Sequence, residues 1–140
     1  MTRAVAVDLG TRRIGIAVSD SAGALAFPRP LVERCGDRAA EHVAIERIVD
    51  EVGAQILVVG LPLCLDGRRG PAALAAAQEA TELARRFSVR GVDVVTFDER
   101  YTTVEAEAGL VAAGRGGRAR RARVDSAAAT VLLQSWLDAR

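Results

Sequence analysis

A run of four apolar residues at 56–59 lies between two segments that have the periodicity of helices. Before it, residues 38–52 repeat apolar side chains at the spacing of one helix face, and Gly53 provides a stop. After it, Pro71 opens a second helical segment in the favoured first-turn position. A short, continuous apolar run between helices is typical of a parallel strand that is buried on both faces. The chain is therefore expected to fold as an α/β protein.

Strand patterns also occupy the first part of the chain, where apolar residues alternate with small ones. They predict strands at residues 3–9, 14–19 and 25–32. The first two are separated by a short turn at residues 10–13 and are expected to pair as a hairpin. Pro28 and Pro30 favour an edge position for the third strand.

The later elements alternate between strand and helix. The patterns predict a strand at 92–97, a helix from Thr102 to about residue 114, and a last helix at about 125–137. An antiparallel meander followed by alternating helices and strands predicts a mixed five-stranded sheet flanked by helices. The whole chain, residues 1–140, is expected to form one domain.

Composition excludes several classes of protein. Half of the 140 residues are hydrophobic, which argues against disorder, and no apolar run approaches the ~20 residues of a membrane-spanning helix. The N-terminal strand pattern breaks at Asp8, so we expect a cytoplasmic protein without a signal peptide. Cys35 and Cys64 belong to no metal-spacing motif, and His42 is the single histidine, which disfavours zinc and a Ser-His-Asp triad.

Three acidic residues stand where a carboxylate needs an explanation. Asp8 lies near the end of an apolar strand, where it is costly unless it is functional or caps the next amide of a turn. Glu99 follows the strand at 92–97, and its alternative is a surface acid paired with an arginine. Asp125 heads the buried stripe of the last helix, where it would also favour the helix as an N-cap.

The expected topology brings these acids together. Adjacent strands are expected to carry Asp8 and Glu99 at their ends, and the last helix brings Asp125 over the same edge. Clustered carboxylates repel one another unless cations neutralise them, and oxygen ligands suit Mg²⁺ or Mn²⁺. Two such ions, roughly 3.5–4 Å apart, activate water and stabilise the leaving oxygen of a phosphodiester. The combination predicts a metal-dependent nuclease with three carboxylates that are both catalytic residues and metal ligands.

The basic residues are all arginine, and five of them gather in residues 114–124, which contain no acid. This segment carries +5 whereas the whole chain carries +1, so it is a local basic site on an acidic remainder. The expected contact is with nucleic acid phosphates, which gives affinity without sequence reading, and the alternative is a solvated charge run. The five residues are Arg115, Arg118, Arg120, Arg121 and Arg123. No aromatic platform accompanies them, so stacking on single-stranded bases is not expected.

Four motifs follow one another along nearly the whole chain. They are DLGTRRIG at 8–15, GLPL at 60–63 with DG at 66–67 and GP at 70–71, DER at 98–100 with TTVEA at 102–106, and DSAAA at 125–129 with LLQ at 132–134. Each motif alone is weak, but their order makes them specific together. The chain resembles the bacterial YqgF/RuvX family, whose members are described as pre-16S rRNA nucleases and as Holliday junction resolvase-like proteins.

The resemblance implies an RNase H-like fold and catalytic carboxylates at Asp8, Glu99 and Asp125. It also implies processing of the 5′ end of the 16S rRNA precursor, with ribosomal particles as partners and branched DNA as the alternative substrate. Two residues depart from the family pattern. Ser126 stands where lysine is frequent, which is expected to weaken a phosphate contact, and Tyr101 stands where leucine is common.

Three further residues are candidates for substrate binding. Thr11 and Arg12 lie in the turn beside Asp8 and are placed to touch a phosphate, although a plain turn explains them equally well. Arg100 is expected either to orient Glu99 or to contact the substrate.

Three alternative functions stay open at this point. A Holliday junction resolvase would need a dimer to place two symmetric cuts, and the sequence leaves monomer and homodimer open. Residues 8–11 also resemble the phosphate loop of sugar kinase and actin-type ATPases, but those need two such domains and this chain supplies one. A non-catalytic RNA-binding ribosome-assembly factor would keep the fold without cleavage, and the presence of all three carboxylates argues against it.

Overall fold

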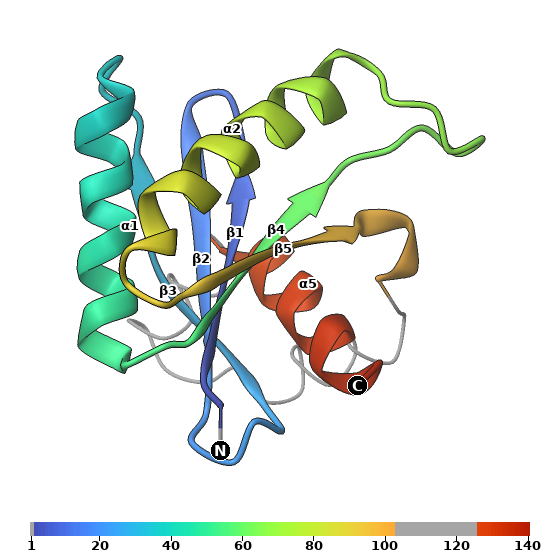
Figure 1. The fold of residues 1–140 in the computed structure, drawn as a ribbon. Coiled ribbons are helices and arrows are strands. Elements are labelled where there is room, and N and C mark those ends of the chain that lie inside the picture. Colours follow the sequence, from blue (N-terminus) through green and yellow to red (C-terminus); the bar gives the residue numbers. More distant parts are fainter. Residues whose placement is uncertain (1, 103–125) are drawn as a thin grey trace.

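Five strands form a single sheet in the part of the chain that the computed structural model describes, residues 2–102 and 126–140 (Figure 1). The strands lie side by side in the order β3-β2-β1-β4-β5. Their bounds are β1 (Ala4–Leu9), β2 (Arg13–Ser19), β3 (Ala26–Glu33), β4 (Ile56–Leu61) and β5 (Asp93–Asp98). β1 to β3 form an antiparallel meander, whereas β4 is parallel to both β1 and β5. The mixed five-stranded sheet expected from the sequence is confirmed.

Two helices cover one face of this sheet, and a third covers the other (Figure 1). α1 (Arg38–Val52) and α2 (Pro71–Ser88) pack their apolar stripes against Val5 and Val7 of β1. α5 (Ala127–Asp138) packs against the opposite side chains of the same strand, Ala4 and Ala6. Successive side chains of a strand point to opposite faces, so β1 is buried on both sides. None of the described helices is both long and apolar enough to cross a membrane.

The helix ends follow local rules that the sequence displays. The Asp37 side chain caps α1 by accepting a hydrogen bond from the backbone N–H of Ala40. Gly53 ends the helix in the left-handed region at φ 66°, where glycine is favoured. α2 begins with Pro71 at its first turn, as predicted.

Two predicted boundaries need comment. α5 begins at Ala127 with Ser126 as its N-cap residue, two residues later than the prediction, and Asp125 lies outside the described residues. From residue 103 on, the helix predicted after Thr102 also lies outside them. Between β5 and that segment, the structure forms one 3-10 turn, η1 (Glu99–Tyr101), which the sequence patterns did not predict.

Candidate active site

Asp8 stands at the end of β1 that is nearest to the first residues of α5. It pairs with Gly15 of β2, and a β-carbon added to Gly15 would lie 3.6 Å from Cβ of Asp8 and 3.4 Å from Cβ of Ala129. The absence of a side chain on Gly15 therefore leaves room beside Asp8 for the start of α5. The Asp8 side chain is half-buried, and this burial raises the pKa of its carboxyl group above the usual value.

Glu99 begins η1, directly after β5, and is also half-buried. Burial, followed by the negative charges of Asp8 and Asp98, raises the pKa of its carboxyl group to about 7. Asp8 is therefore close enough to Glu99 to repel its ionised form. Two of the three predicted carboxylates lie in one electrostatic site.

The expectation that adjacent strands carry Asp8 and Glu99 is wrong, because β4 lies between β1 and β5. Gly60 of β4 explains how the two carboxylates still meet. A β-carbon added there would lie 3.1 Å from Cδ of Glu99 and 3.0 Å from Cδ2 of Leu132, so the Glu99 side chain lies over the bare backbone of β4. The apolar run at 56–59 did not include Gly60, whereas β4 continues through it to Leu61. A glycine inside an apolar strand is itself a signal of close approach, and it could have found this position.

Arg100 pairs with Asp98 and not with Glu99. Its Nη2 lies 2.6 Å from Oδ2 of Asp98, its Nε donates to the same carboxylate, and its Nη1 donates to the carbonyl oxygen of Leu65 at 3.3 Å. Among the described residues, no cation forms an ion pair with Glu99. The alternative of a surface acid neutralised by its neighbouring arginine therefore applies to Asp98, and the carboxylate of Glu99 is left within electrostatic reach of Asp8.

Thr11 and Arg12 are exposed on the turn between β1 and β2, directly after the strand that carries Asp8. A cleft of about 910 Å³ begins at Asp8 and passes along this turn. Its other walls are the segment from the end of β3 into the first turn of α1, with Gly36 and Arg38, and the first turns of α2. Asp8 and the turn thus line the same open groove.

Ser126 shows where the chain enters α5. Its hydroxyl group accepts a hydrogen bond from the backbone N–H of Ile16 at 3.0 Å and donates one to the carbonyl oxygen of Arg29 at 2.7 Å. Its side chain is 1% exposed, so this serine joins α5 to β2 and β3 and does not point to solvent. The expectation that serine here weakens a phosphate contact finds no support in this geometry.

The remaining predicted site residues lie outside the described part of the chain. They are Asp125 and the five arginines Arg115, Arg118, Arg120, Arg121 and Arg123. Their roles stay predictions.

The described donors fit a hard divalent cation. Asp8 and Glu99 supply carboxylate oxygens only, and each would be easier to ionise beside a positive charge. Within residues 2–102 and 126–140, no group of three or more histidine, cysteine or acidic side chains is poised to hold a metal. A magnesium or manganese site at Asp8 and Glu99 would thus need further oxygen ligands from another residue, water or a phosphate.

Comparison with known proteins identifies relatives along the whole chain. Residues 2–139 match the family RuvX, described as Holliday junction resolvase. A protein of Mycolicibacterium paratuberculosis, named as a candidate pre-16S rRNA nuclease, is 45% identical over 139 residues, which are 99% of this chain and 81% of that protein. A protein of Desulforudis audaxviator with the same name is 39% identical and covers 99% of this chain and 95% of its own length.

Solved structures agree on the fold. RuvC of Thermus thermophilus, in complex with a Holliday junction substrate, superimposes with a TM-score of 0.61 at 13% identity, covering 100% of this chain and 96% of that chain. A second structure of Thermus thermophilus RuvC gives a TM-score of 0.58 at 14% identity, covering 99% and 96%. The fold is therefore RNase H-like, as expected. With the family match over residues 2–139 and relatives of 39–45% identity, this chain belongs to the RuvX family.

Proposed function

We propose that this protein is a divalent-metal-dependent nuclease that hydrolyses phosphodiester bonds. Asp8 and Glu99 are its catalytic carboxylates and the ligands of Mg²⁺ or Mn²⁺, and Asp125 is the third. The observation that carries the proposal is the pKa of Glu99, which burial and then the negative charges of Asp8 and Asp98 raise to about 7. Two acids kept close at such an electrostatic cost are typical of a site that is completed by a cation.

The residues at the site divide the work. Bound cations would polarise the phosphate and supply the activated water for hydrolysis. Asp8 and Glu99, whose elements lie on either side of β4, would hold these cations. Thr11 and Arg12 bind the phosphate from the exposed turn, where an arginine can donate two parallel hydrogen bonds to it. Arg100, which is held by Asp98, contributes positive charge beside the same edge.

The position of Ser126 supports a role for Asp125. Cα of Ser126 lies 3.6 Å from the place that a β-carbon on Gly15 would occupy, and Gly15 is the strand partner of Asp8. Ser126 therefore lies beside the pair of strands that carries Asp8. Because Asp125 directly precedes Ser126 in the sequence, we propose it as the third carboxylate.

The proposed substrate is the 5′ end of the 16S rRNA precursor, bound in the cytoplasm on the free RNA or on ribosomal particles. It rests on the names of the relatives, which are 39–45% identical to this chain. The five arginines between residues 115 and 123 would bind the RNA backbone and add affinity that falls with salt. In this proposal the 140 residues act as one nuclease domain, as a monomer or a homodimer.

A second candidate substrate is a four-way DNA junction. The family description, Holliday junction resolvase, favours it. Two symmetric cuts across a junction need two active sites, so this activity requires a homodimer. The two candidates share the carboxylate site and differ in the nucleic acid presented to it.

The test is cleavage of two labelled substrates, a 16S precursor 5′ fragment and a four-way DNA junction, with Mg²⁺ or Mn²⁺. We expect wild type to cut one of them only with metal, and Asp8→Asn to lose about 100-fold or more, because the variant removes a charged metal ligand. Asp93→Asn is the matched control, since Asp93 is an exposed acid at the opposite end of β5. Cleavage of neither substrate by wild type, or equal cleavage by Asp8→Asn, would overturn the proposal and favour a non-catalytic RNA-binding protein.

A further inference from the structure

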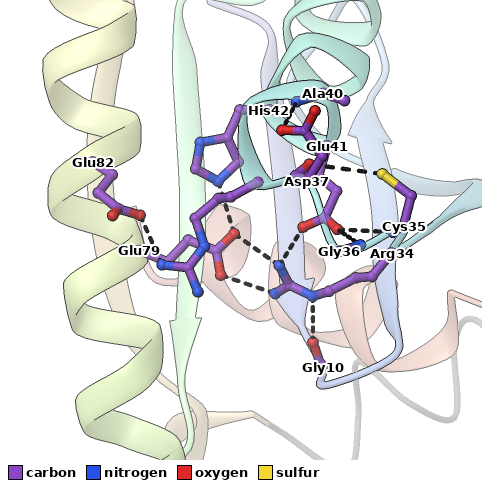
Figure 2. A network of polar contacts seen from close by, with 11 residues as sticks. Gly10, Arg34, Cys35, Gly36, Asp37, Ala40, Glu41, His42, Glu79 and Glu82 are labelled. Atoms are coloured by element: carbon purple, nitrogen blue, oxygen red, sulfur yellow. Dashed lines mark hydrogen bonds and ion pairs between the residues drawn. The ribbon is translucent and has the colours of Figure 1, made fainter.

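A buried network of charged residues lies on the α1 and α2 side of the sheet, at the same end as Asp8 (Figure 2). At its centre is Arg34, which follows the last residue of β3. Arg34 Nη1 donates to Oε1 of Glu41 at 2.9 Å and to Oε2 of Glu79 at 3.0 Å, while Nη2 donates to Oε1 of Glu79 at 2.9 Å. Glu41 belongs to α1 and Glu79 to α2, so one guanidinium group joins both helices to the end of β3.

The carboxylates of this network are ionised inside the protein. Glu41 and Glu79 are 4% and 3% exposed, and His42 at 4% places its Nε2 2.7 Å from Oε2 of Glu79. Burial alone would raise the pKa of Glu79, but hydrogen bonds from His42 and Arg34 lower it to about 2. Glu41 additionally accepts backbone N–H groups from Cys35 at 2.9 Å and Gly36 at 3.2 Å. This network of hydrogen bonds between buried side chains favours one geometry of its members.

The Nε–H group of Arg34 points at the turn between β1 and β2. Nε donates to the carbonyl oxygen of Gly10 at 2.8 Å, and the backbone N–H of Arg34 donates to the carbonyl oxygen of Arg12 at 3.0 Å. Arg34 therefore holds both sides of the turn that carries Thr11. The turn itself is closed by the N–H of Gly10, which donates to the carbonyl oxygen of Arg13 at 3.1 Å.

Joining α1 to α2 does not require this network. Arg86 of α2 already forms an ion pair with Glu46 of α1 at 2.6 Å, and Arg90 reaches the same carboxylate at 2.9 Å. Neither pair touches the turn. Burying ionised side chains adds little net stability compared with apolar side chains of the same volume, so a specific geometry is the benefit that distinguishes the Arg34 network.

We propose that Arg34 is a positioning residue for the turn at residues 10–13. Glu41 and Glu79 hold the Arg34 side chain, and Arg34 in turn fixes the backbone of the turn. The fixed turn then places Thr11 and Arg12 in contact with a substrate phosphate beside Asp8. This inference rests on the proposed function, because it assumes that the turn meets a phosphate. Arg34 itself lies on the α1 and α2 side and acts through the backbone of Gly10 and Arg12.

The test compares Arg34→Lys with Arg86→Lys, two changes that keep the charge and lose the planar fork. Amide hydrogen exchange is measured first, on the free protein, at the N–H groups of residues 10 and 34, which the bonds of the turn protect. We expect exchange about tenfold faster in Arg34→Lys and unchanged in Arg86→Lys. Glu79→Gln is the second variant, because it removes the charge that binds the Arg34 guanidinium group and leaves the arginine itself unchanged.

Cleavage kinetics supply the second readout, at a temperature where all variants are folded. The proposal expects Arg34→Lys to raise KM about tenfold with a smaller change in kcat, since the turn binds the phosphate. Unchanged exchange at residues 10 and 34 would overturn the inference, and so would faster exchange with unchanged KM. If wild type cuts neither substrate, the proposed function fails, whereas the exchange result still decides whether Arg34 anchors the turn.

Discussion

Gly60 is the residue on which the geometry of the carboxylate pair depends. It is the penultimate residue of β4, the strand that lies between β1 and β5, and its missing side chain leaves room for Glu99 to lie over β4. The identities of the two carboxylates were readable in the sequence because each is an acid at the end of an apolar strand. The close approach of the two carboxylates across Gly60 could not be predicted from the sequence. It depends on the order of the strands in the sheet, which local patterns do not encode.

Gly60→Ala is expected to reduce metal-dependent cleavage at least about tenfold with a stability loss of roughly 1–3 kcal/mol. The added methyl group would lie 3.1 Å from Cδ of Glu99 and 3.0 Å from Cδ2 of Leu132, so one of them has to move. Cleavage rates and unfolding midpoints of the single variant and of Gly60→Ala with Leu132→Val separate the two clashes. If the double variant recovered full activity, Leu132 and not Glu99 would be the group displaced.

The raised pKa of Glu99 predicts a pH-dependent loss of stability when no metal is present. In the unfolded chain its carboxyl group ionises near pH 4.5, and in the folded protein near pH 7, so its buried charge disfavours the folded state above that range. Glu99→Gln is therefore expected to stabilise the metal-free protein at pH 8 by roughly 1–2 kcal/mol, after discounting for solvent screening of this half-exposed group, and to change little at pH 4.

Thermal unfolding in a chelator at both pH values measures this difference. Asp93→Asn serves as the control, because Asp93 is exposed at the start of β5. An equal effect of Glu99→Gln at pH 4 and pH 8 would show that the charge of Glu99 is not what the substitution relieves.

At the scale of elements, the strands and helices themselves were predictable. The period of two in β1 and β2, the continuous apolar run in β4, and the stop of α1 at Gly53 are local signals, and the structure confirms each of them. The charged residues inside the helix interfaces were not predicted. Glu41 and Glu79 occupy the same stripes as Ile45 and Leu83, four residues further on, and an acid in such a stripe is a signal that could have been used.

Ser126→Ala is expected to cost about 2–3 kcal/mol of stability, because it leaves the N–H of Ile16 and the carbonyl oxygen of Arg29 buried without their partner. Urea unfolding measures it, and Ser88→Ala is the control, since the exposed hydroxyl of Ser88 bonds only within its own helix. A cost equal to that of Ser88→Ala would mean that Ser126 does not hold α5 to the sheet. Local sequence patterns do not reveal this role, because the bond to Ile16 joins residues 110 positions apart.

At the scale of the whole molecule, the two charged clusters lie at the same end of β1 but on opposite faces of the sheet. α5 and the carboxylates lie on one side, and the Arg34 network lies on the other. The RNase H-like fold followed from the resemblance together with the order of elements, and the comparisons confirm it. Substrate choice did not follow, since phosphates are common to RNA and DNA and the arginines that would bind them read no sequence.

The central claim is that Asp8 and Glu99 together bind a divalent cation, and Mn²⁺ binding measured by electron paramagnetic resonance tests it without any assumption about substrate. We predict that wild type and Asp93→Asn bind Mn²⁺ equally, and that Asp8→Asn and Glu99→Gln each weaken binding at least about tenfold, or about 1.4 kcal/mol. Equal Mn²⁺ affinity in all four proteins would contradict the claim.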